Sequence, residues 1–156
     1  MNFTSIYHRF AGASDFLQAP LLLVIRLFWG WQFAQTGWGK LTDLGKTSAF
    51  FASLNLPAPY LSAALAGGTE CLGGALLLLG LCSRGAALAL TFTMAVAYAT
   101  ADHEALHAVF NDPDKFTGAA PFLFLFAALI ILAFGPGPLS LDRFVFGSDR
   151  TTKSGK

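Results

Sequence analysis

Two ionisable side chains interrupt long apolar runs of this sequence, and they are the first candidates for chemistry. Glu70 lies in AGGTECLGGALLLLG, between two pairs of glycines, and Arg26 lies in PLLLVIRLFWGWQFAQTGWG. A lone charge in an apolar environment is costly, so it is either neutralised or paired. Counted at about 1.5 Å per residue, the two residues lie at depths that a long Arg side chain can largely bridge. The sequence therefore predicts a buried ion pair between Arg26 and Glu70.

Such a pair has two interpretations, and the sequence leaves both open. A structural pair locks two helices together, whereas a functional pair marks a polar site or a proton pathway inside a membrane. Trp29, Gln32, Gln35 and Lys40 could contact a quinone ring beside it, although aromatic and amide side chains are also common at helix interfaces. The catalytic residues, if there are any, stay unknown.

Histidines and cysteines are weaker candidates. His103 and His107 are four residues apart in ADHEALHAVFND, but two ligands do not make a metal site, and a solvated polar loop explains the same residues. We expect this loop to be exposed and to bind no metal on its own. Cys71 and Cys82 lie about 16 Å apart along one expected helix, too far for a disulfide.

The composition predicts the elements that position these side chains. Hydrophobic residues make up 54% of the chain and charged residues 12%, with a mean hydropathy of +0.57, far above an ordinary soluble domain. Four apolar runs, 20–39, 61–82, 85–101 and 116–135, are of a length that can cross a hydrocarbon core of roughly 30 Å. They lack the period-two alternation of a barrel. We therefore predict an all-α membrane protein, a bundle of four transmembrane helices.

Small residues predict how the first two of these helices pack. Arg26 shares a helix face with glycines of the first run, and Glu70 lies on a face of small residues in the second. Such faces let helices approach closely in a membrane. The glycines expected at helix contacts are Gly30, Gly37, Gly67, Gly73 and Gly74.

The distribution of cations predicts the orientation. Four crossings place the short turn LCSRG on the same side of the membrane as both termini. That side carries six cations, Arg9, Arg84, Arg143, Arg150, Lys153 and Lys156, against three on the other, Lys40, Lys46 and Lys115. By the positive-inside rule, both termini are expected in the cytoplasm.

Three motifs in order resemble the DoxX family of small bacterial four-helix membrane proteins. They are RLFWGWQFAQTGWGK, TECLGGALLLLGLCSRGAA and GPGPLSLDRFVFG, and the resemblance covers about residues 20–147. It implies a multi-pass inner-membrane protein, and relatives in this family include small subunits of thiosulfate:quinone oxidoreductase and partners in redox complexes linked to thiol or oxidative stress. Residues 1–19 are then a cytoplasmic N-terminal segment, 20–147 the membrane domain and 148–156 a polar tail.

Three functions remain open at this point. The first is a small membrane subunit of a quinone-linked or stress-linked redox system, an oxidoreductase subunit that acts with a partner because the chain shows no haem or iron-sulfur ligand set. The second is a noncatalytic assembly subunit, and the third, weaker, is a small-solute carrier. The expected partners are the lipid bilayer and either another protein or further copies of this chain, and not nucleic acid. Quinone is the one cofactor that the residues suggest.

Overall fold

The described part of the chain consists of helices joined by turns and short loops, with no strand among residues 3–146. A computed structural model describes the backbone of residues 3–146 and the side chains of residues 16–145. Its helices are α1 (Phe3–Thr42), α2 (Leu44–Ser53), α3 (Pro59–Leu79), α4 (Ser83–Thr100), α5 (His103–His107), α6 (Pro113–Gly118), α7 (Pro121–Phe134) and α8 (Leu141–Phe146). The predicted all-α class is confirmed.

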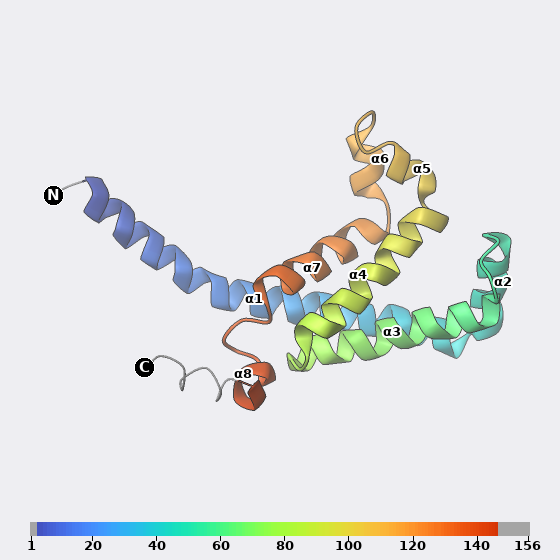
Figure 1. Cartoon of the computed structure of the whole chain (residues 1–156), viewed down its shortest axis with the longest axis horizontal. Helices are drawn as coiled ribbons and strands as arrows, with labels where there is room; N and C mark the ends of the chain where they lie inside the picture. The colour runs from blue at the N-terminus through green and yellow to red at the C-terminus, as the bar shows by residue number, and fades with distance from the viewer. Residues whose placement is uncertain (1–2, 147–156) are drawn as a thin grey trace, which may run out of the picture.

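The most extensive helix–helix interface in the fold is the antiparallel packing of α1 on α3 (Figure 1). Glycines make this close approach possible, because a Cβ on Gly37 would lie 2.6 Å from the carbonyl oxygen of Gly67, and one on Gly74 would lie 2.6 Å from that of Gly30. Gly67 itself faces Lys40 and Leu41. The two small-residue faces therefore meet, as their spacing in the sequence suggests.

Helices α4 and α7 pack mainly on each other and complete the core. Phe33 of α1, Leu77 of α3, Leu90 of α4 and Ile131 of α7 are fully buried in one hydrophobic cluster. Gly73 lies on this side of α3, where a Cβ would lie 2.9 Å from Leu90. It therefore makes room for α4, whereas Gly67 and Gly74 make room for α1.

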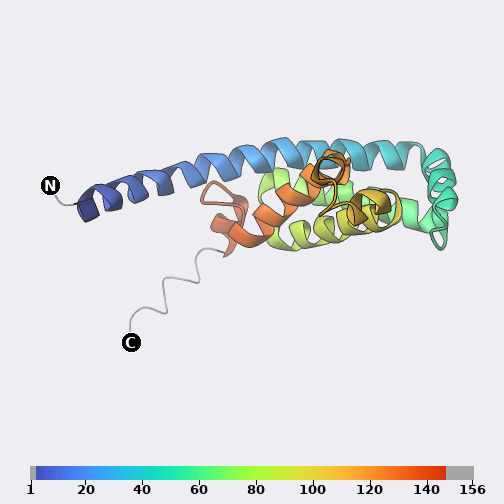
Figure 2. The same cartoon turned by 90° about the horizontal axis from the view of Figure 1, so that it is seen from above.

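The two ends of the bundle are built differently (Figure 2). The turn between α3 and α4 lies at one end, together with residues 135–146, and α2, α5 and α6 lie at the other (Figure 1). Asp43 starts α2 by accepting a hydrogen bond from the backbone N–H of Lys46, and Asp112 starts α6 in the same way through Lys115.

The helix boundaries differ from the apolar runs in two places. Helix α1 begins at Phe3, well before the run that starts at Pro20, because the preceding residues are polar enough to escape a hydropathy pattern and still continue the helix. The fourth run is split between α6 and α7, since Pro121 begins a new helix at its first turn.

Two helical segments, Phe16–Thr42 and Pro59–Leu79, are long and apolar enough to cross a membrane. Helix α4 has 18 residues but is less apolar than these two segments. Helix α7 is apolar but has only 14 residues, about 21 Å in length. Four crossings therefore stay a prediction.

Candidate functional site

Glu70 is buried at the α1–α3 interface and is paired with Lys40. The carboxylate side chain is 3% exposed and that of Lys40 is 30% exposed, and the Lys40 ammonium donates a hydrogen bond to Glu70 Oε2. Gly67, one helical turn before Glu70, leaves the space that the Lys40 stem occupies, since a Cβ there would lie 3.1 Å from Lys40 Cβ. The charge of Glu70 is thus balanced from the last turn of α1.

The predicted ion pair between Arg26 and Glu70 is not formed. Both side chains are buried, but the antiparallel register places Arg26 level with Gly80, where a glycine Cβ would lie 2.6 Å from Arg26 Nη1. Glu70 lies ten residues earlier on α3, about 15 Å away along the axis. The prediction takes the start of the first run to be level with the end of the second, so that Arg26 would lie six residues inside that level. In the structure Arg26 is instead level with Gly80, close to the end of the second run, and Glu70 is out of its reach.

Arg26 instead binds the backbone of the segment that follows α7. Its Nη1 donates to the carbonyl oxygen of Pro136 at 2.9 Å and its Nη2 to that of Leu139 at 2.7 Å. This segment turns at Gly135 and Gly137, whose positive φ angles of 79° and 80° suit glycine. Non-helical backbone has carbonyls without intrahelical partners, and Arg26 satisfies two of them.

Asp142 connects the same segment to the turn between α3 and α4. Its carboxylate accepts hydrogen bonds from the backbone N–H of Cys82 at 2.6 Å and of Ser83 at 2.9 Å, and its own N–H donates to the carbonyl of Gly80 at 2.8 Å. Asp142 therefore caps α4 from a distant part of the sequence. No local pattern indicates this role, because the cap lies about sixty residues away from the helix that it caps.

The other expected ligand contacts do not gather around Lys40 and Glu70. Trp29 packs edge-to-face on Phe124 of α7, with ring centroids 5.0 Å apart. Gln32 is half-buried and Gln35 is exposed. Of the four residues that could contact a quinone, only Lys40 is shown in contact with the buried carboxylate of Glu70.

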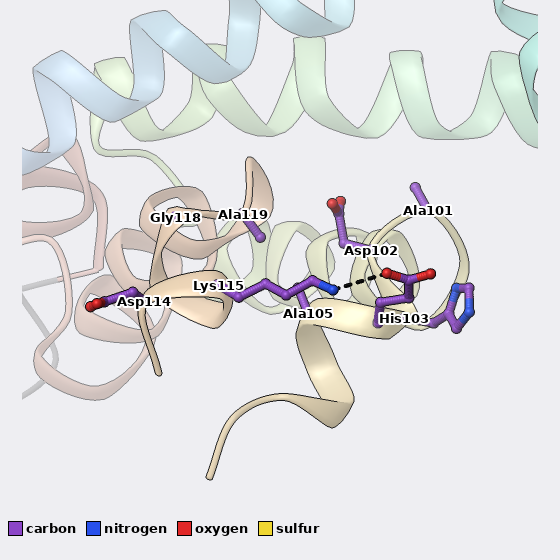
Figure 3. A pocket seen from close by; sticks show the side chains of 9 residues that line it. Ala101, Asp102, His103, Ala105, Asp114, Lys115, Gly118 and Ala119 are labelled. Carbon is purple, nitrogen blue, oxygen red and sulfur yellow. Dashed lines mark hydrogen bonds and ion pairs between the residues drawn. The ribbon is translucent and has the colours of Figure 1, made fainter. Parts of the chain in front are cut away.

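A shallow hollow of about 440 Å³ lies between α4, α5 and α6 (Figure 3). Asp102, His103 and Glu104 line it from one side and Asp114 and Lys115 from the other. Lys115 Nζ lies 2.9 Å from Glu104 Oε2, and this hydrogen bond lowers the pKa of the Glu104 carboxyl, with smaller contributions from the charges of Lys115 and His103.

The expected exposure of the two histidines is confirmed, but they lie at the two ends of the short helix α5 and not in a loop. His103 and His107 are both exposed. Among the residues that the structure describes, no group of three or more His, Cys, Asp or Glu side chains could hold a metal ion. Cys71 is partly buried and Cys82 is exposed, and both are free thiols.

Comparison with known families gives one clear result. A family model described as DoxX matches residues 21–103, which is more than half of the chain. The chain belongs to the DoxX family. The matched region contains Arg26, Lys40, Glu70 and Gly80, so both cations and the residues that they face on α3 and at its C-cap lie within it. Neither curated proteins nor solved structures gave a match.

Proposed function

We propose that this DoxX protein is a multi-pass protein of the bacterial inner membrane that serves as a small membrane subunit of a redox system. Membership of the family supports the membrane location, and the two long apolar helices support crossings by α1 and α3. Helix α7 is short, and the segment 135–140 extends its path toward the Arg26 end of the bundle. The hydrogen bonds from Arg26 support this path, since non-helical backbone is tolerated at membrane depth where protein groups satisfy it.

The Lys40–Glu70 pair is the observation that carries the redox proposal. Ionisable residues inside membrane helices mark proton or substrate pathways, and here the carboxylate is buried while part of the ammonium stays accessible. Reduction of a quinone to a quinol takes up two electrons and two protons. In this proposal the Lys40 ammonium would hydrogen-bond a quinone oxygen, and Glu70 would pass the two protons to the quinone one after the other, taking each of them from solvent. The electrons come from a partner protein, because the sequence shows no haem or iron-sulfur ligand set.

A second function is favoured because each of the two cations on α1 joins this helix to another part of the bundle. Lys40 joins α1 to α3 and Arg26 joins α1 to the segment after α7. Both can therefore be explained as residues that stabilise the packing of a noncatalytic assembly subunit. In that case the pair only specifies packing.

Gentle purification in detergent, followed by mass spectrometry for bound quinone and for copurifying proteins, separates the two functions. The redox subunit is expected to bring quinone and an electron-carrying partner. A partner without quinone supports the assembly subunit, and a preparation with neither contradicts both.

The double variant Lys40→Met, Glu70→Gln sharpens this test, because it removes both charges while the packing stays similar. A redox site predicts a folded protein that no longer binds quinone and no longer complements a deletion strain under oxidative stress. A pair that only specifies packing predicts that complementation is retained. Gln18→Leu is a matched control, since Gln18 is an exposed polar residue of the same helix and lies twenty-two residues before Lys40.

A further inference from the structure

One face of α1 is unused by the bundle and follows a seven-residue repeat. The positions alternate in steps of three and four along the whole helix, and we call this set the α1 seam. It consists of Phe3, Tyr7, Phe10, Ser14, Leu17, Leu21, Val24, Phe28, Trp31, Gln35 and Trp38. A sustained repeat of this kind is the pattern by which two helices pair along a left-handed supercoil.

The described part of the seam is uncovered. Its apolar members from Leu17 to Trp38 are between 56% and 64% exposed, and Gln35 is exposed as well. The residues of α1 that pack on the rest of the molecule, such as Arg26, Gly30, Phe33 and Gly37, fall at other positions of the repeat and are buried. The seam is therefore a second face of α1, separate from the one that holds α3.

Charges are excluded from the seam over its full length. The Asp, Glu, Lys, Arg and His residues of α1 are His8, Arg9, Asp15, Arg26 and Lys40, and none of them falls on one of the eleven seam positions. A face that pairs with a copy of itself brings each residue close to its own counterpart, so a single charge would repel itself. The absence of charges in the seam sequence fits self-association.

Lipid alone does not account for the seam. Helix α1 has 40 residues, about 60 Å, which is about twice the thickness of a hydrocarbon core. His8, Arg9 and Asp15 precede the apolar run that begins at Pro20, and the N-terminal turns of α1 extend past the other helices in both views (Figures 1 and 2). The repeat nevertheless continues there as Phe3, Tyr7 and Phe10. Outside the hydrocarbon an apolar repeat needs a protein partner, and within it a Gln in contact with lipid is costly, whereas Gln can hydrogen-bond across a helix pair.

We infer that two copies of this chain form a parallel dimer through their α1 seams. Like residues then face each other, with Phe28 against Phe28 and Gln35 against Gln35, and the polar Gln35 fixes the register. Both copies keep the same orientation in the membrane, as a parallel pair requires. The inference rests on the proposed crossing of α1, and it is independent of the redox role.

Cysteine cross-linking in isolated membranes tests this dimer. In a background of Cys71→Ser and Cys82→Ser, single changes Leu21→Cys, Val24→Cys and Phe28→Cys are each oxidised with copper phenanthroline. We expect a disulfide-linked species of twice 16.6 kDa from all three. Leu65→Cys and Leu72→Cys are matched controls, because these α3 residues are 61% and 69% exposed and lie off the seam.

Equal cross-linking at the α3 controls, or none at the seam positions, would overturn the dimer. Native mass spectrometry of the unmodified protein in mild detergent gives a second readout, in which a monomer at all concentrations also overturns it. Fractionation keeps the two proposals apart. A chain in the soluble fraction contradicts the membrane location and with it the parallel dimer, whereas an inserted chain that does not cross-link at the seam contradicts the dimer alone.

Discussion

Glu70 and Lys40 form a pair of unequal partners, and the inequality predicts their mutational behaviour. Lys40→Met leaves a buried carboxylate without its cation, which typically costs about 3–5 kcal/mol. Glu70→Gln is expected to cost less, because the partly exposed Lys40 ammonium can move toward solvent. The double variant is expected to regain much of the stability that Lys40→Met loses. Thermal unfolding in detergent of the wild type, both single variants and the double variant measures this coupling.

The matched control is the pair that the sequence predicts and the structure does not form. Arg26→Met combined with Glu70→Gln is expected to show additive losses, since the two sites share no partner and lie about 15 Å apart along the helix axis. A recovery in that double variant would mean that Arg26 and Glu70 do interact.

Glu104 gives a prediction about pH. The hydrogen bond from Lys115 lowers the pKa of this carboxyl, so the stabilisation by the pair is present above the ordinary Glu pKa and is lost as the pH falls through the lowered value. Lys115→Ala is expected to raise the pKa of Glu104 toward its ordinary value. Carboxyl ¹³C NMR titration of labelled glutamates reports this change, and Lys46→Ala, at an exposed lysine on α2, serves as control. An unchanged titration of Glu104 in Lys115→Ala would contradict the assignment.

The α1–α3 helix pair depends on glycines that approach backbone atoms. Gly37→Ala places a Cβ 2.6 Å from the carbonyl oxygen of Gly67, where only a shift of the two helices relieves the clash. We expect a loss at the upper end of the roughly 1–3 kcal/mol typical of overpacking. Gly68→Ala is the control, since nothing lies within 4 Å of a Cβ there. It should be neutral or stabilise by up to about 1 kcal/mol. Equal losses in thermal unfolding would show that contact geometry does not decide the effect.

Helix α4 depends on a cap that comes from outside it. Asp142→Ala removes the acceptor for the N–H groups of Cys82 and Ser83, and we expect a loss of about 0.5–2 kcal/mol. Asp142→Asn keeps a side-chain oxygen and should lose less. Amide hydrogen exchange at the first turn of α4 measures the local effect, with Asp114→Ala, at an exposed acid, as control. Unchanged protection in Asp142→Ala would rule out the cap.

For the whole molecule, the native cysteines report orientation. The proposed topology places the exposed Cys82, in the turn between α3 and α4, on the cytoplasmic side, so a membrane-impermeant maleimide should label it in inverted vesicles and not in intact spheroplasts. Phe110→Cys introduces a thiol at the opposite end of the bundle, where Phe110 is 92% exposed. It should show the reverse pattern. Labelling of both sites from the same side would mean that the number of crossings between them is even.

The sequence by itself determined the properties that depend on composition and local spacing. Apolar runs predicted helices, and small residues at helical intervals predicted the faces on which α1 and α3 meet, because both patterns repeat within a few residues. The motifs around Arg26 and Glu70 pointed to the DoxX family, which the family comparison shows. The burial of Arg26 and Glu70 also followed from their position within apolar runs.

Only the tertiary structure decided which groups those buried charges contact. The partner of Glu70 depends on the register of two antiparallel helices. That register places Arg26 beside Gly80, out of reach of Glu70, and brings Lys40 to the carboxylate. Likewise, the carbonyls that Arg26 binds belong to Pro136 and Leu139, more than a hundred residues later in the sequence. Asp142, which caps the start of α4, follows α7 in the sequence. Hydropathy and periodicity describe one segment at a time. The distances between segments arise only when the helices pack, and that packing places Lys40 at Glu70 and keeps Arg26 at the other end of the same interface.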